Sequence, residues 1–138
     1  MNILLSPDYR PSKKEKFMNS RMLEYFRQRL LNWRAELVHE SNDTLQHLQE
    51  GGIVGADIAD RASIETNRSL ELRARDRSRK LIAKIDAALM RVDNGSYGYC
   101  EETQEPINLS RLEARPIATF SIEAQERHER SEKMHRDD

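Results

Sequence analysis

The chain has 138 residues, of which 34% are charged and 37% hydrophobic, so we expect a single domain with a small core and long solvated helices. Such a composition disfavours a large enclosed active site. The 23 lysines and arginines against 24 aspartates and glutamates leave a formal charge of −1, which disfavours sequence-general binding to nucleic acid. A single cysteine cannot form a disulfide within the chain, and the N-terminal residues lack the apolar run of a signal peptide or membrane helix. We therefore expect a cytoplasmic protein that is not embedded in a membrane.

The N-terminal residues 1–18 show neither helical nor strand periodicity, so they are predicted to form an irregular arm. Asn19 or Ser20 can cap a helix, which the glycines at Gly51 and Gly52 would end. Its apolar residues recur at spacings of three and four, as in a helix that packs along a partner helix. The predicted seam becomes sparse toward its end and comprises Leu23, Phe26, Leu30, Trp33, Leu37, Leu45 and Leu48.

A second helix is predicted to start near Asp57 or Asp60 and to end at Asn94, before a glycine. Its predicted seam, richest toward the C-terminal end, comprises Leu70, Ala74, Ser78, Leu81, Ile85, Ala88 and Val92. Antiparallel pairing would bring the apolar ends of the two helices together. The expected fold is therefore mostly α: a long antiparallel coiled-coil hairpin over 19–94, with its tip at 51–60, protruding from a small globular lobe.

The segment 95–138 is predicted to contain an aromatic hairpin-like stretch, an extended stretch and a charged helix that starts near Phe120 or Ser121. Two pairs of positions within it have the spacing of a four-cysteine zinc ribbon, and they are Cys100, Thr103, Ser121 and Ala124. Only one of the four is a cysteine. The spacing alone fits two alternatives equally well. One is a degenerate zinc-ribbon-like segment, and the other is a small αβ cap unrelated to any metal-binding fold.

Longer motifs carry a family resemblance. The stretch "DRASIETNRSLELRARDRSRKLIAKIDAAL", followed by "YGYC" and "RLEARPIA", resembles the DksA transcription factors of bacteria. The stretch "FMNSRMLEYFRQRLLNWRAEL" is similar to the first helix of that family. The resemblance covers residues 17–130, and the single cysteine resembles the zinc-free variant form of the family.

The resemblance implies a regulator of transcription that is not an enzyme. Such a factor binds RNA polymerase, inserts its coiled coil through the secondary channel and destabilises promoter open complexes. It acts with the alarmone ppGpp in the stringent response, lowering ribosomal RNA transcription and raising some amino-acid biosynthesis promoters. It makes no direct contact with nucleic acid. We expect a monomer with no tightly bound cofactor.

The resemblance also implies three groups of site residues. The family's D-x-x-D-x-A tip, which acts near the polymerase active site, matches Asp57, Asp60 and Ala62. Contacts with the polymerase rim correspond to Arg73, Arg77 and Lys80. The ppGpp site at the polymerase interface corresponds to Leu81, Lys84 and Arg115. Better-known members have a lysine where this chain has Gln125, which removes one phosphate-binding charge.

Each assignment has a simpler interpretation. Either tip aspartate can serve only as an N-cap, and the alternating charges near Asp76 also suit a solvated coiled-coil surface. Two other functions also stay open: a Gre-like stimulator of transcript cleavage, in which Asp57 and Asp60 would hold a metal, and a coiled-coil adaptor.

A structural zinc needs about four thiolate, imidazole or carboxylate ligands, so Cys100 alone cannot hold the ion. We predict that the segment holds no zinc, that Cys100 is half-buried, and that Cys100→Ser costs little activity. The hydroxyls of Thr103 and Ser121 are expected to satisfy backbone groups instead. The predicted apolar core of the segment is Tyr97, Tyr99, Ile107, Leu112, Ile117 and Phe120.

Overall fold

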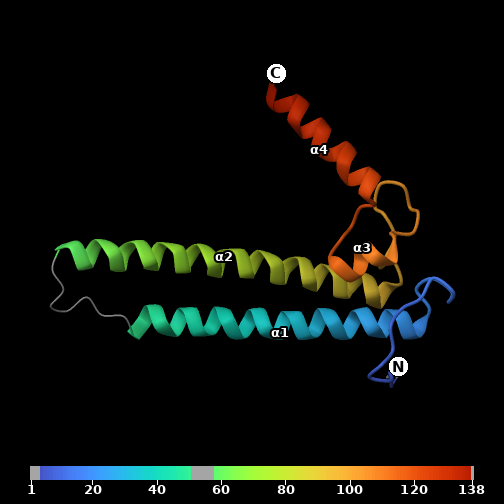
Figure 1. The fold of residues 1–138 in the computed structure, drawn as a ribbon, viewed down its shortest axis with the longest axis horizontal. Coiled ribbons are helices and arrows are strands. Elements are labelled where there is room, and N and C mark those ends of the chain that lie inside the picture. The colour runs from blue at the N-terminus through green and yellow to red at the C-terminus, as the bar shows by residue number, and fades with distance from the viewer. Residues whose placement is uncertain (1–3, 51–57, 138) are drawn as a thin grey trace. The chain divides into compact units, whose positions relative to one another are not determined.

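The structure is a computed structural model that describes the backbone of residues 4–50 and 58–137, and the side chains of 4–46 and 61–135. These residues form four α-helices: α1 (Ser20–Glu50), α2 (Ile58–Asn94), α3 (Leu109–Ala114) and α4 (Ile122–Asp137) (Figure 1). The described backbone contains no strand, only an isolated antiparallel bridge between Tyr99 and Pro106. Among the described helices, none combines the length and apolar character that a membrane span requires. The mostly helical fold with a long helical hairpin is confirmed.

Capping residues define the start of α1 and the end of α2. Asn19 caps α1, because its Oδ1 accepts a hydrogen bond from the backbone N–H of Met22 at 3.0 Å. At the end of α2, Gly95 has a φ of +83°, and the backbone N–H of Ser96 donates to the carbonyl of Arg91 at 3.0 Å. A left-handed glycine with this hydrogen bond is a Schellman C-cap. The predicted start of α1 and end of α2 are confirmed.

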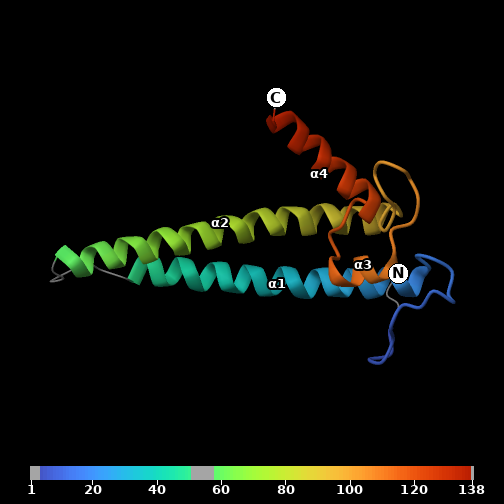
Figure 2. The same ribbon diagram turned by 45° about the horizontal axis from the view of Figure 1, so that its top comes forward.

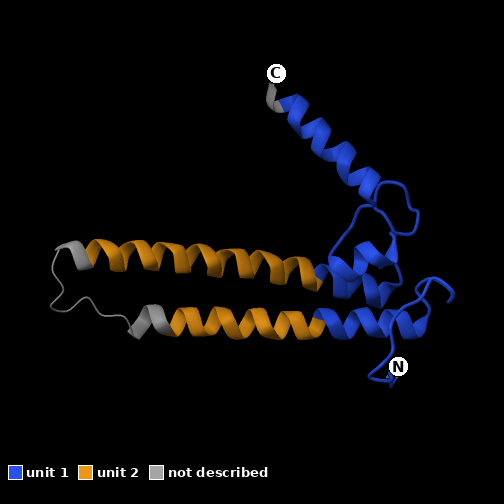
Figure 3. Ribbon diagram, viewed as in Figure 1, with its two compact units in different colours: residues 1–30, 87–138 blue, residues 31–86 orange. Residues whose placement is uncertain are grey.

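The chain divides into two compact units (Figure 3). Unit 1 comprises residues 1–30 and 87–138, and unit 2 comprises residues 31–86. The buried apolar residues of unit 1 are Met22, Phe26, Leu30, Ala88, Val92, Tyr97, Cys100, Ile107, Leu112, Ile117, Ala118 and Ala124. Those of unit 2 are Leu37 and Ile85. Most of the core of the described residues therefore lies in unit 1.

Tyr97 occupies the centre of the unit 1 core. It is fully buried, its ring lies 5.4 Å from that of Phe26, and its hydroxyl donates to the carbonyl of Pro116 at 2.7 Å. Burial raises the pKa of Tyr97, so the phenol stays protonated and keeps this hydrogen bond. The predicted core positions at Tyr97, Ile107, Leu112 and Ile117 are confirmed, whereas Tyr99 and Phe120 are only half-buried.

The prediction of an extended stretch before residue 120 is wrong for its first part, which forms α3. Asn108 caps this short helix, because its Oδ1 accepts from the backbone N–H of Ser110 at 3.2 Å. The helix buries Leu112 completely. Arg29 donates to the carbonyl of Glu113 at 2.8 Å and thereby links α1 to α3. The cap and this burial stabilise a helix that the sequence-based prediction missed.

The described part of the N-terminal arm is irregular, as predicted, yet it packs closely on α1. The Tyr9 hydroxyl donates to Glu15 at 2.9 Å, and the Arg21 guanidinium lies 4.6 Å from the centre of the Tyr9 ring. The Tyr9 ring also meets the Tyr25 ring edge-on at 6.0 Å. Burial, together with the hydrogen bond to Glu15, raises the pKa of Tyr9 to about 12. Aromatic and ionic contacts thus hold a segment that has no periodicity.

In unit 2 the two helical segments lie side by side and run in opposite directions (Figures 1 and 2). Arg34 on α1 and Asp86 on α2 form an ion pair across them, with Nε and Oδ1 at 2.7 Å. Because both side chains are about half exposed, solvent screens this pair and it contributes little to stability. Burial of Leu37 and Ile85 therefore contributes more to the pairing than this charge contact.

Part of the predicted α2 seam is wrong. Leu70 is 55% exposed and Ala74 is exposed, whereas the half-buried positions from 64 to 78 are Ile64, Arg68, Glu71, Asp76 and Ser78. Ile64, Glu71, Ser78 and Ile85 are spaced by sevens, so the seam keeps one heptad register along α2. Polar residues occupy two of these four positions: Ser78, which the predicted seam includes, and Glu71, which an apolar pattern could not reveal.

Candidate functional site

Of the four zinc-ribbon positions, Cys100 and Thr103 lie in a turn after α2, whereas Ser121 directly precedes α4 and Ala124 lies in its first turn. Cys100 is fully buried, so the expectation that it is half-buried is wrong. Its backbone N–H donates to the carbonyl of Glu105, and its carbonyl accepts from Gln104, both at 2.8 Å. Gly98, with a φ of +92°, accepts from Ile107 at 2.7 Å and completes the turn. These bonds close the turn around the sulfur.

Both hydroxyls predicted to bond backbone groups do so. Thr103 Oγ1 accepts from the N–H of Glu105 at 3.3 Å. Ser121 Oγ accepts from the N–H of Ala124 at 3.2 Å and caps α4. The prediction made from the sequence is therefore confirmed at both positions.

Hydrogen-bond donors converge on the sulfur of Cys100. Burial opposes ionisation of the thiol, but hydrogen bonds from the Thr103 hydroxyl and the backbone N–H groups of Ser121, Thr103 and Glu102 outweigh it. Together they lower the pKa of Cys100 to about 6. The thiolate is thus stabilised by donors from the protein itself.

The donor set does not fit a structural zinc ion. Zinc in such sites takes four ligands from thiolate, imidazole or carboxylate groups. Ala124 has no donor atom, and the hydroxyls of Thr103 and Ser121 already bond backbone N–H groups. In the described part of the chain, no group of three or more His, Cys, Asp and Glu side chains could hold a metal ion.

A cluster of charged and aromatic side chains links the turn to α4. Glu102 accepts from Arg127, with Nη2 at 3.2 Å, and pairs with His128 Nε2 at 3.1 Å. The His128 ring lies 4.5 Å from the Phe120 ring, tilted by 32°. The sequence carries no signal for this pairing, because Glu102 is far from His128 in the chain and no spacing rule connects them.

The basic run of α2 lies on an exposed surface of unit 2. Arg73 and Arg77 are exposed, and neither forms an ion pair with another described residue. Lys80 and Arg79 both pair with Asp76, at 3.2 and 3.1 Å, and the hydrogen bond from Lys80 lowers the pKa of Asp76. Arg73 and Arg77 are therefore open to a partner, as is the exposed Arg75 between them.

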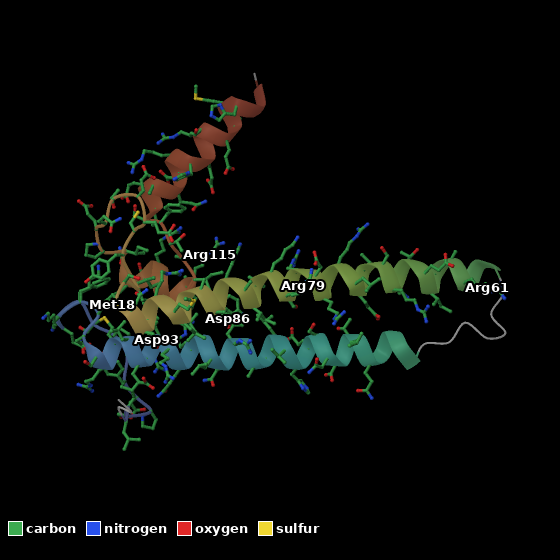
Figure 4. The ribbon with its side chains drawn as sticks, turned by 180° about the vertical axis from the view of Figure 1, so that it is seen from behind. Met18, Arg61, Arg79, Asp86, Asp93 and Arg115 are labelled. Carbon is green, nitrogen blue, oxygen red and sulfur yellow. The ribbon has the colours of Figure 1, made fainter. Side chains whose placement is uncertain are left out.

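The predicted tip is only partly described. Asp57 lies outside the described residues, and so does the side chain of Asp60, whose backbone is in the first turn of α2. Ala62 is exposed, as is Arg61, which Figure 4 labels at the start of α2. The geometry of the two tip carboxylates therefore stays a prediction.

The residues assigned to the ppGpp site belong to different units, and the exposure of each is given within its own unit. Lys84, in unit 2, is exposed and Leu81 is half-buried beside it. Arg115, in unit 1, is exposed and follows the last turn of α3 (Figure 4). Gln125 donates from its side-chain amide to Glu129 at 3.1 Å. This position therefore carries a neutral side chain that already has a hydrogen-bond partner.

A helical hairpin joined to a zinc-finger-like turn with a single cysteine defines the class of protein. Residues 22–92 match the family model described as "DnaK suppressor protein DksA, N-terminal domain". Residues 95–130 match the "Prokaryotic dksA/traR C4-type zinc finger". The chain therefore belongs to the DksA family.

Individual relatives cover nearly the whole chain. The "RNA polymerase-binding transcription factor DksA" of Caulobacter vibrioides is 67% identical over 131 residues, 95% of this chain and 92% of the relative. The protein of the same name from Escherichia coli is 43% identical over 115 residues, 83% of this chain and 76% of the relative. The solved transcription factor DksA2 from Pseudomonas aeruginosa matches with a TM-score of 0.77 and 43% identity, covering 85% of this chain and 90% of that one.

Proposed function

We propose that this protein binds RNA polymerase and regulates transcription initiation. The observation that carries the proposal is the 67% identity, over 95% of the chain, to a relative named RNA polymerase-binding transcription factor DksA. The coiled-coil hairpin enters the secondary channel of the polymerase, destabilises promoter open complexes and acts with ppGpp. It does so as a cytoplasmic monomer, without catalysis and without direct contact with nucleic acid.

Asp57 and Asp60 act after docking, as hydrogen-bond acceptors close to the polymerase active site. Two carboxylates three residues apart near a helix start share one face of that helix. Ala62, which is exposed, belongs to the same tip. Arg73, Arg77 and Lys80 supply rim contacts, supported by the exposure of all three. Lys80 exchanges its partner Asp76 for an acidic group on the polymerase.

Lys84 and Arg115 bind phosphates of ppGpp, with Leu81 as an apolar neighbour in the site. Both cations are exposed, and phosphate forms charge-assisted hydrogen bonds with such groups. Gln125 contributes no charge, so the effect of ppGpp is weaker than in relatives with a lysine at this position.

The turn around Cys100 works without zinc. Hydrogen bonds to the sulfur and the contacts of Glu102 with Arg127 and His128 take the structural place of a metal. This is supported by the donor set, in which three of the four ribbon positions offer no thiolate.

In vitro transcription from a ribosomal RNA promoter tests the proposal. Asp60→Asn should abolish promoter inhibition and leave polymerase binding nearly intact, because asparagine keeps the size of the side chain but removes its charge. Glu65→Gln, an equal change on an exposed α2 residue five positions further on, should leave inhibition unchanged.

Failure of the unaltered protein to bind polymerase would refute the proposal. Equal loss of binding and inhibition in Asp60→Asn would refute the role of the tip. Stimulated transcript cleavage in a stalled elongation complex would favour the Gre-like alternative, and self-association in gel filtration would favour the adaptor.

A further inference from the structure

A cleft in unit 1 shares only Ser121 with the site residues predicted from the sequence. Its volume is about 430 Å³, and it lies between the N-terminal arm, the turn after Cys100 and the first turn of α4. Its apolar lining consists of Phe17, Pro106, Ile107, Leu109 and Ile122. Ile122 is 48% exposed and Pro106 is exposed, so apolar surface remains open to solvent here. A cleft of this size can take two or three side chains of a partner.

The rim of the cleft carries more negative than positive charge. Its charged residues are Glu15, Glu105, Glu123 and Lys13. Glu15 already accepts from the Tyr9 hydroxyl at 2.9 Å and from the N–H of Ser12 at 3.0 Å. The side chains of Glu105 and Glu123 are exposed and make no hydrogen bond or ion pair within the described chain. Two carboxylates are therefore open to a ligand, against one ammonium group.

We propose that this cleft docks a short segment of a partner protein in which an apolar side chain lies next to a lysine or arginine. The apolar side chain would fill the space beside Phe17 and Ile122 and displace water from the surface described above. The neighbouring cation would pair with Glu105 and Glu123, whose uncompensated charge selects against acidic segments. The fit is with a basic peptide segment rather than a free anion, because the carboxylates repel anions.

Titration of the isotope-labelled full chain with peptides, followed by nuclear magnetic resonance, tests the cleft without the polymerase. The probes are two blocked hexapeptides that share two leucines and differ only in carrying two lysines or two glutamates. The lysine peptide should shift the backbone amide signals of Ile107, Leu109 and Ile122. Its affinity should be about tenfold higher than that of the glutamate peptide and should fall as salt is added.

Matched variants locate the interaction. Glu105→Lys should weaken the lysine peptide about three- to fivefold, whereas Glu101→Lys, an equal change in the same turn but outside the cleft, should not. Ile122→Gln should weaken both peptides, whereas Met134→Gln on the exposed end of α4 should not.

Four results would each overturn the proposal. These are equal affinity for the two peptides, an absence of shifts at the three amides, an equal effect of the control variants, and concentration-dependent shifts at the cleft without peptide. The last result would assign the cleft to a second copy of the chain.

Discussion

The buried thiolate of Cys100 makes the stability of unit 1 depend on pH. The pKa falls from an ordinary 9.0 to about 6 on folding, and each pH unit of difference corresponds to about 1.4 kcal/mol. The full contribution is therefore about 4 kcal/mol. Because the folded state binds the proton less tightly than the unfolded state, this stability is present above pH 9.0 and is lost as the pH falls through about 6.

The same relation gives the contribution of the thiolate to stability at pH values suitable for experiment. The thiolate contributes about 2 kcal/mol near pH 7.5 and about 0.2 kcal/mol near pH 5.5. Cys100→Ser removes it, because a serine hydroxyl does not ionise in this range. The free energy of unfolding of the unaltered protein, minus that of the variant, should therefore rise by about 2 kcal/mol between these pH values.

Urea unfolding, followed by near-ultraviolet circular dichroism, measures this difference through the packing of the tyrosines in unit 1. Subtracting the unfolding free energy of the variant removes the contribution of the histidines and carboxylates, because both proteins share these groups. A difference that stays constant with pH would refute the reasoning. The full burial of Cys100 adds an expected cost in stability, whereas the expectation that this substitution costs little activity stays a prediction.

Three further predictions concern metal, alarmone and backbone. EDTA should leave the helical circular dichroism and melting temperature unchanged, and metal analysis should find well under one zinc per chain; stoichiometric zinc would contradict the proposed zinc-free turn. Lys84→Ala and Arg115→Ala should reduce the ppGpp enhancement of promoter inhibition by up to about tenfold, and Gln125→Lys should raise it, because charged hydrogen bonds to phosphate contribute about 1.5–3 kcal/mol; no change in either direction would place ppGpp elsewhere. Gly98→Ala should lower the unfolding free energy more than Gly95→Ala, since both have positive φ but only the first would bring a Cβ within 3.0 Å of another side chain; equal losses would show that the backbone alone sets the cost.

Sequence reasoning succeeded where local rules dominate. The cap at Asn19 and the C-cap glycine at Gly95 gave two ends of the hairpin, because each signal acts within one helical turn. Tyr97, Ile107, Leu112 and Ile117 were recognised as core because large apolar side chains in a polar chain must pack together.

Sequence reasoning failed where contacts join distant parts of the chain. The pairing of Glu102 with His128 and the packing of Tyr9 on Arg21 depend on tertiary structure, and single-sequence periodicity carries no signal for them. The α2 seam was misplaced because Arg68 and Glu71 occupy positions where the apolar pattern required hydrophobic residues. The tip assignment of Asp57 and Asp60 came from family resemblance alone and stays a prediction.

The polar seam of α2 sets how firmly that helix is held along its length. Ile85 is fully buried, whereas Ser78, Glu71 and Arg68 bury little apolar surface against α1. Opening a turn near Arg68 exposes less apolar area than opening one near Ile85, so its local free energy of unfolding is lower. Backbone amides in unit 2 should thus exchange with solvent progressively faster from Ile85 toward Ile64. The coiled coil therefore has a higher local free energy of unfolding near Ile85 than near Ile64. The less stable end can change its shape against a surface while the more stable end stays folded.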